Sequence, residues 1–219
     1  FDDDVEYREE ASDERAPRTV RSSMLRITFA DSSVTAAVFS GGVQFEEEGL
    51  HASGSEAQYD PTNGTLRLSG TDGGGTPHVA DEQIEVDADV IDVMLAGGQM
   101  TAGGSVTTLL FAGASGRLPG LLQQAEPVNV SADTLDYEGG AGAALYEGNA
   151  TLWQGATAIR ADRIMLDRAN ADLVASEAER TARELGIGEA VGRGGEVGDK
   201  DDARVVNDDI EEEPSAVKD

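Results

Sequence analysis

Cysteine is absent from this sequence of 219 residues, and histidine, aromatic residues and positive charge are scarce. Without cysteine the chain can form neither disulfides nor thiolate metal sites. The 16 basic residues face 43 acidic ones, and the net charge of −27 leaves no basic footprint for a phosphate backbone, so no nucleic-acid partner is expected. No apolar run reaches the roughly eighteen residues that a membrane-spanning helix needs, so we expect no transmembrane segment in this chain.

Residues that carry chemistry are few and scattered. His51 and His78 have no partner at the spacing of a zinc site or a catalytic triad, and isolated histidines are more often structural. The acidic runs 2–4 and 46–48 lack the alternating spacing of a calcium-binding loop. The glycine-rich segments precede no Lys-Ser or Lys-Thr pair and are interpreted as turns rather than phosphate-binding loops. We therefore predict no catalytic residue, no metal site and no cofactor.

What the sequence does contain is alternation and glycine. Residues 128–132 alternate apolar and polar, which is the period of a strand with one buried face. At Asp133 the phase slips, and Leu135 and Tyr137 carry the apolar face onward. Such a slip predicts a β-bulge, where a short polar side chain can satisfy freed backbone groups. The Ala-Asp pair that marks the slip occurs at Ala80-Asp81, Ala132-Asp133 and Ala161-Asp162.

A fixed spacing supports an internal repeat. The last apolar residue after each slip is followed eleven positions later by a glycine, in the pairs Tyr59 and Gly70, Val86 and Gly97, and Tyr137 and Gly148. From Leu166 the same step reaches Glu177, where the glycine is missing. The sequence thus predicts repeated β units, joined by turns such as the Pro-Thr-Asn-Gly segment 61–64.

Composition divides the chain into five segments. They are a charged lead-in (1–18), a first set of strands (19–111), a Gly/Pro loop (112–127), a second set of strands (128–176) and an acidic tail (177–219). A capping box that begins at Ser176 predicts a short helix, which competes with a final strand. The rest of the tail has too few large apolar residues to form a core, and we expect it to be disordered.

At this point the residues resemble a known family. The run Tyr146-Glu147-Gly148-Asn149-Ala150-Thr151-Leu152-Trp153-Gln154-Gly155, followed by Ile159-Arg160-Ala161-Asp162-Arg163-Ile164, is similar to the OstA-like domain. That domain is shared by the lipopolysaccharide-transport proteins LptA and LptC and the periplasmic part of LptD. The resemblance is strong over 127–175 and weaker over 25–111.

The resemblance implies an all-β fold, a twisted and open β-jellyroll of antiparallel strands whose interior holds the acyl chains of lipid A. It also implies a periplasmic location and a bridge between the inner and outer membranes, built by stacking similar domains through their edge strands. The partners expected are therefore lipopolysaccharide and other Lpt-type β-jellyroll proteins. Because the chain begins at Phe1, we expect any signal peptide or anchor to lie upstream of it.

The apolar phase predicts which side chains would line such a slot. The candidates are Ile27, Phe29, Phe39, Val43, Phe45, Tyr59, Leu66, Leu68, Ile84, Val86, Leu95, Val130, Leu135, Tyr137, Leu145, Leu152, Ile159, Ile164 and Leu166. With so few aromatics, either a slot for acyl chains or a packed core of small aliphatic residues is allowed. The alternative function is that of a structural scaffold without a lipid ligand, built as a β-solenoid of parallel coils.

Overall fold

The structure is a computed structural model that describes residues 5–11, 16–30, 33–70, 75–111, 122–123 and 126–177. The short helix predicted from Ser176 onward and the predicted disordered tail fall mostly or wholly on residues outside these ranges. No helix within the described ranges is long and apolar enough to cross a membrane.

The described chain is almost entirely β-strand, and every strand pair in it is antiparallel. The predicted all-β, open jellyroll of antiparallel strands is therefore confirmed, and the parallel coils of a β-solenoid are not what this chain forms. The elements are β1 (Val5–Glu9), β2 (Arg18–Ser22), β3 (Met24–Ala30), β4 (Ser33–Glu47), β5 (Leu50–Asp60), β6 (Thr65–Ser69), β7 (His78–Ala80), β8 (Ile84–Asp87), β9 (Val90–Met94), β10 (Gln99–Leu110), β11 (Val128–Glu138), the 3-10 turn η1 (Gly139–Ala141), β12 (Ala143–Gln154), β13 (Thr157–Asp167) and β14 (Asp172–Ser176).

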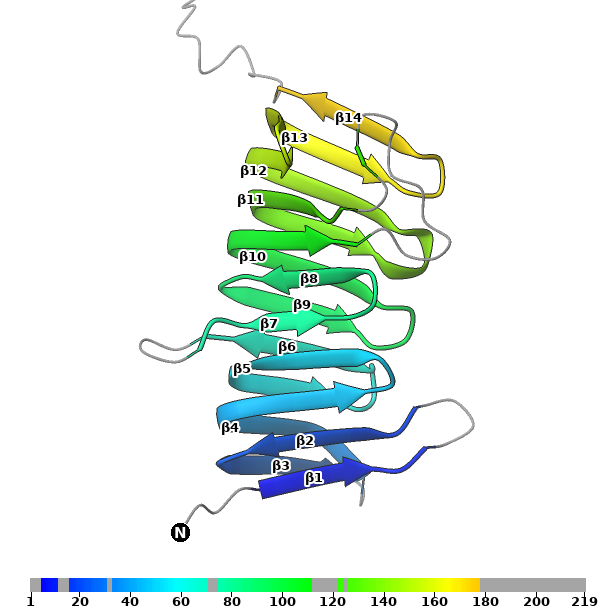
Figure 1. Cartoon of the computed structure of the whole chain (residues 1–219). Coiled ribbons are helices and arrows are strands. Elements are labelled where there is room, and N and C mark those ends of the chain that lie inside the picture. Colours follow the sequence, from blue (N-terminus) through cyan, green and yellow to red (C-terminus); the bar gives the residue numbers. More distant parts are fainter. Residues whose placement is uncertain are drawn as a thin grey trace, which may run out of the picture. The chain divides into compact units, whose positions relative to one another are not determined.

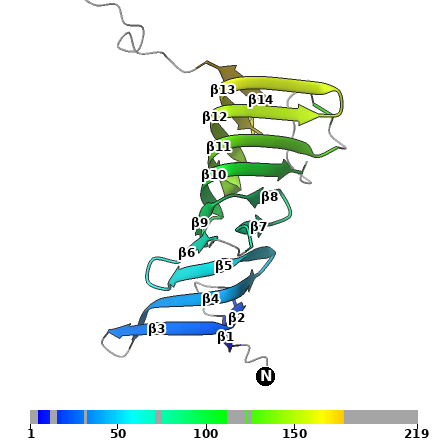
Figure 2. The same cartoon turned by 90° about the vertical axis from the view of Figure 1, so that its left-hand side faces the viewer.

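The strands follow one another in an order close to that of the sequence, and Figures 1 and 2 show this stack from two sides. The long strands each contribute to two half-sheets, because their pairing partners change part-way along the strand. Half-sheet A contains β3, residues 33–40 of β4, 56–60 of β5, β6, β9, 99–103 of β10, 134–138 of β11, 143–147 of β12, 163–167 of β13, and β14. Half-sheet B contains β1, β2, residues 43–47 of β4, 50–54 of β5, β7, β8, 106–110 of β10, 128–132 of β11, 150–154 of β12, and 157–161 of β13.

The half-sheets join at corners, and where paired long strands cross a corner their register shifts at a β-bulge. The register shifts between Ser40 and Val43, Gly103 and Val106, Ser131 and Thr134, and Glu147 and Ala150. The bulge predicted at Ala132-Asp133 is thus confirmed, and Asp162 lies opposite another. Ala80-Asp81 forms a turn between β7 and β8 instead, where the Asp81 carboxylate accepts the backbone N–H groups of Gln83 and Ile84 at 2.6 and 2.9 Å.

Two corners are built alike, one from residues 89 and 104 and the other from residues 133 and 148. Each position in the first corner precedes its counterpart in the second by 44 residues. Gly104 and Gly148 both have φ of +79°, and each packs against an aspartate, Asp89 and Asp133 respectively. The predicted eleven-residue step therefore describes a real unit, a strand of half-sheet A, its hairpin turn and the return to the corner. The pair Val86 and Gly97 was wrong, because β8 belongs to half-sheet B and Gly97 forms the hairpin turn between β9 and β10.

The inward faces of both half-sheets share one hydrophobic core. The Tyr7 ring on half-sheet B meets the Phe39 ring on half-sheet A edge to face, with centroids 5.8 Å apart. The two half-sheets are joined along one side by the corners. At each end of the stack lies an unpaired strand edge. We call the remaining side the seam, where the turns at the free ends of the half-sheets lie.

Candidate ligand-binding interior

Most of the predicted slot residues lie together in the interior. Fourteen of the nineteen are buried, at 2% exposure or less, namely Phe39, Val43, Phe45, Tyr59, Leu66, Leu68, Ile84, Val86, Val130, Leu135, Tyr137, Leu152, Ile164 and Leu166. Leu95 and Ile159 are partly buried and pack against the same core, and Ile27 is half-buried on β3. Alternation therefore placed these side chains correctly, while their binding of lipid stays a prediction.

Two of the predicted residues lie elsewhere. Leu145 occupies the outward face of β12, between the buried Ala144 and Tyr146, because the small alanine and the tyrosine take the inward positions. Phe29 is 64% exposed, since β3 is an edge strand whose register shifts after Thr28. The prediction favoured the larger aliphatic side chain at 145 and so missed Tyr146, which is fully buried.

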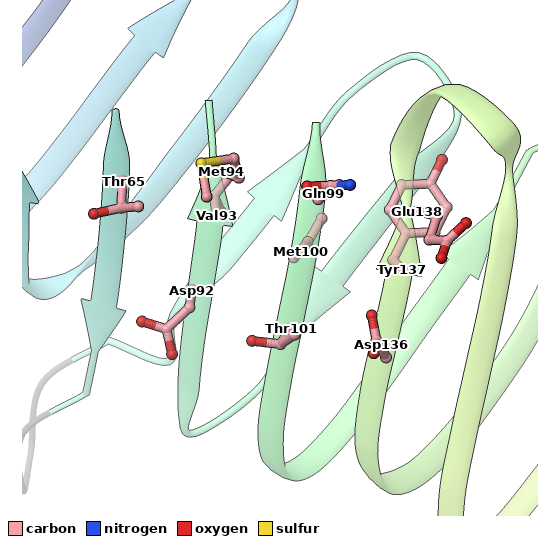
Figure 3. Close-up of a pocket in the computed structure, with 10 residues that line it drawn as sticks. All are labelled: Thr65, Asp92, Val93, Met94, Gln99, Met100, Thr101, Asp136, Tyr137 and Glu138. Atoms are coloured by element: carbon pink, nitrogen blue, oxygen red, sulfur yellow. The ribbon is translucent and has the colours of Figure 1, made fainter. Parts of the chain in front are cut away.

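Within the described ranges the core residues pack against one another and are almost fully buried. The three described cavities, of about 500, 410 and 360 Å³, each have at most one predicted slot residue in their lining. The largest is a groove at the turn end of β9, β10 and β11, and Figure 3 shows Met94 and the carboxylates of Asp92 and Asp136 along it. Space for an acyl chain between the half-sheets therefore requires these side chains or the half-sheets to move apart.

Near the N-terminal end, a buried arginine ties the half-sheets together across the seam. Arg18, on β2, donates to the Tyr59 hydroxyl on β5 and to the Glu47 carboxylate on β4 at 3.1 Å. Tyr59 in turn donates to Glu9 at 3.0 Å, and the Arg18 guanidinium lies 5.2 Å from the centre of the Tyr59 ring. The tie spans the gap because Arg18 belongs to half-sheet B and Tyr59 to half-sheet A.

Burial and charge set the ionisation of this tie. Burial raises the pKa of Glu47, against the opposing effect of Arg18. Burial also raises the pKa of Tyr59 to about 12, again opposed by Arg18 and reinforced by the hydrogen bond to Glu9. At neutral pH Tyr59 therefore stays a neutral hydrogen-bond donor. A cavity of about 360 Å³ adjoins the tie, between Ala16 and Asn63.

A second arginine closes the seam farther along the stack. Arg168 follows β13 on half-sheet A, and it donates to the Phe111 carbonyl at 2.9 Å and to the Gln83 side chain, both at free ends of half-sheet B. Its guanidinium lies over Gly142, where a β-carbon would come within 2.9 Å of Nε. Both arginines are about 95% buried. Neither arginine was predicted; the signal in the sequence is that each stands at or next to the end of a strand in a chain with only 16 basic residues.

No side chain in the described ranges forms a metal-binding group of three or more His, Cys, Asp or Glu residues. His51 is exposed, and His78 Nδ1 pairs with Asp87 at 3.0 Å on the surface. The predicted lack of catalytic residues and cofactors stays a prediction. What the arrangement offers chemically is an apolar interior that runs along the stack and is closed on one side by polar ties.

Among known proteins, only solved structures match this chain. No family model matches the chain, and no curated protein matches it. Nineteen chains of solved structures do match. One is LptH from Pseudomonas aeruginosa, described as the LptA homologous periplasmic component of the conserved lipopolysaccharide transport device. It is 12% identical, with a TM-score of 0.48, over 66% of this chain and 89% of that chain. The fold of this chain is established by its own strand pairings.

Proposed function

We propose that this protein carries lipopolysaccharide in the periplasm, with the acyl chains of lipid A between its two half-sheets. The observation that carries the proposal is the single apolar interior shared by both half-sheets. The resemblance of residues 127–175 to the OstA-like domain supports the same function. We propose no catalysed reaction, and the protein would act by removing acyl chains from water.

Loading an acyl chain would exchange a polar tie across the seam for the burial of methylenes. Each buried methylene contributes about 0.8 kcal/mol, so roughly ten methylenes contribute on the order of 8 kcal/mol. Breaking a buried ion pair costs about 3–5 kcal/mol. Burial of one acyl chain can thus offset the release of one arginine tie. We propose that chains enter at the seam, because the corners are held by continuous strands whereas the seam is held by side chains.

The strand edges suit assembly with similar domains. At one end β1 and β3 each pair with a single strand, and at the other end β14 and residues 157–161 of β13 do so. Free edges bind another strand through backbone hydrogen bonds. We therefore propose that copies of this chain or other Lpt-type domains stack on these edges to form the bridge between membranes.

Photo-crosslinking of the full chain with lipopolysaccharide tests the proposal. Photoreactive residues placed at Leu135, Leu152 and Ile164, all buried, should crosslink to the lipid. The same residue at Asp136 and Arg163, both exposed on neighbouring strand positions, should not. Equal crosslinking at inward and outward positions would contradict binding in the interior.

The packed interior also favours one alternative, a scaffold domain that displays its edges and binds no lipid. Its core would stay closed in the presence of lipopolysaccharide. A folded protein that gives no crosslink at any of the five positions would support this alternative and refute the carrier function.

A further inference from the structure

Arg168 is a buried cation without a carboxylate partner in the described ranges. Its two terminal nitrogens bind neutral acceptors, the Phe111 carbonyl and the Gln83 amide. Arg18, buried to the same degree, has Glu47 at 3.1 Å and Glu9 at 3.9 Å. Residues 112–121, which follow Phe111, contain no acidic residue, although the chain has 43 of them. Among the described residues no carboxylate pairs with the Arg168 guanidinium, and burying an unpaired charge is costly.

Three hydroxyl groups are buried in the same region, and within the described ranges they too lack hydrogen-bond partners. They belong to Tyr137 on β11, Tyr146 on β12 and Thr108 on β10, and Arg168 Nε likewise has no acceptor within the described chain. Tyr137 and Tyr146 lie on the inward face of adjacent strands, since Tyr137 pairs with Ala144. Thr108 comes from half-sheet B and so approaches from across the interior.

Strand pairing places Arg168 beside Tyr137, because Arg168 follows Asp167, which pairs with Ala143, and Tyr137 pairs with the adjacent Ala144. Burial raises the pKa of both tyrosines, and the Arg168 charge opposes this effect at each of them. The Thr108 hydroxyl also lowers the pKa of Tyr146, although the two oxygens do not form a well-directed hydrogen bond. The other charge that acts on Tyr137 is Asp81, whose Oδ1 already accepts two backbone N–H groups.

We propose that Arg168, Tyr137, Tyr146 and Thr108 bind the anionic headgroup of an amphiphile, a phosphate or a carboxylate, whose hydrocarbon chain lies in the adjoining interior. Charged oxygens accept the strongest hydrogen bonds from a guanidinium and from hydroxyls. A buried water could satisfy the hydroxyls, but it could not neutralise the cation. The site lies where the seam meets the core, as an amphiphile requires. This inference rests on the proposed carrier function and names the headgroup chemistry that the carrier selects.

The test compares two ligands that share a dodecyl hydrocarbon chain, dodecyl phosphate and the uncharged dodecyl maltoside. Their affinities for the full-length protein are measured by calorimetry below their critical micelle concentrations. We expect dodecyl phosphate to bind at least about tenfold more tightly. Arg168→Met should abolish this preference and leave dodecyl maltoside binding unchanged. Arg163→Met is the matched control, because it removes the same charge from an exposed position of β13 and should keep the preference.

A second variant covers the case in which Arg168→Met fails to fold. The double change Tyr137→Phe and Tyr146→Phe removes two hydroxyls and keeps both rings, and it should lower the preference by at least about threefold. Inorganic phosphate, which has no chain, should bind far more weakly than dodecyl phosphate, and equal binding would overturn an amphiphile site.

The outcomes separate this inference from the carrier function. Equal affinity of the two amphiphiles for the native protein would overturn the headgroup site and leave the carrier function intact. An equal loss of preference in Arg163→Met and Arg168→Met would also overturn it. Binding of neither amphiphile would refute both.

Discussion

Replacing Gly148 by alanine probes the corner that joins the half-sheets. Gly148 has φ of +79°, which costs an alanine about 1–2 kcal/mol in any surroundings. Its β-carbon would also lie 2.7 Å from the Asp133 β-carbon, so the neighbouring strand must shift. Overpacking of this kind costs about 1–3 kcal/mol, and we expect a total loss of about 2–5 kcal/mol in the free energy of unfolding.

Gly42→Ala is the matched control, because Gly42 has φ of +73° at another corner and nothing within 4 Å of the added carbon. It should lose only the backbone contribution of about 1–2 kcal/mol. Urea unfolding, followed by the fluorescence of Trp153 and by circular dichroism, measures both variants. A loss in Gly148→Ala within about 0.5 kcal/mol of that in Gly42→Ala would refute the tight corner, since additive backbone effects alone would then explain both.

Three further predictions concern the tie, the register and the turns. Arg18→Met should lower the free energy of unfolding by about 3–5 kcal/mol, because it leaves Glu47 buried without its cation. Arg21→Met removes an arginine from an exposed ion pair and should cost less than about 1 kcal/mol. Similar losses in the two variants, measured by urea unfolding, would argue against the tie. Leu152→Ala should lower the free energy of unfolding by about 2–5 kcal/mol and Leu145→Ala clearly less, because Leu152 faces the core and Leu145 does not. The reverse order would mean that the register of β12 is wrong. Hydrogen bonds from Asn63 hold the pKa of Asp60 below its usual 3.8, and those from Asn170 do the same for Asp167. The stability that these bonds contribute is therefore complete above about pH 5 and is lost as the pH falls through the lowered values. An NMR titration that gives either carboxyl a pKa above 3.8 would contradict these turns.

Much of the fold follows from period-two alternation, because one side chain in two faces a shared core. The bulge at Ala132-Asp133 was predictable for the same reason, since a phase slip in a continuing strand requires an extra residue. Ala80-Asp81 shows the limit of this reasoning. The same dipeptide can end a strand, and only the pairing of β7 with β8 distinguishes a turn from a bulge.

The candidate site was less predictable than the fold. Leu145 and Tyr146 are both apolar neighbours in one strand, so composition could not decide which of them faces the core. The ties of Arg18 and Arg168 join residues that are 41 and 85 positions apart in sequence, to Tyr59 and Gln83 respectively. Such contacts depend on how the strands fold over at the corners, and local patterns carry no information about that.

Acyl chains between the half-sheets are the central claim, and methyl NMR tests it without changing any side chain. The full chain, deuterated except at its methyl groups, would be mixed with lipid A. We predict nuclear Overhauser effects from the acyl chains to the inward methyls of Leu68, Leu152 and Ile164, and none to the outward methyls of Leu145, Met165 and Val174. Contacts confined to the outward methyls, or none at all with the protein folded, would contradict the claim.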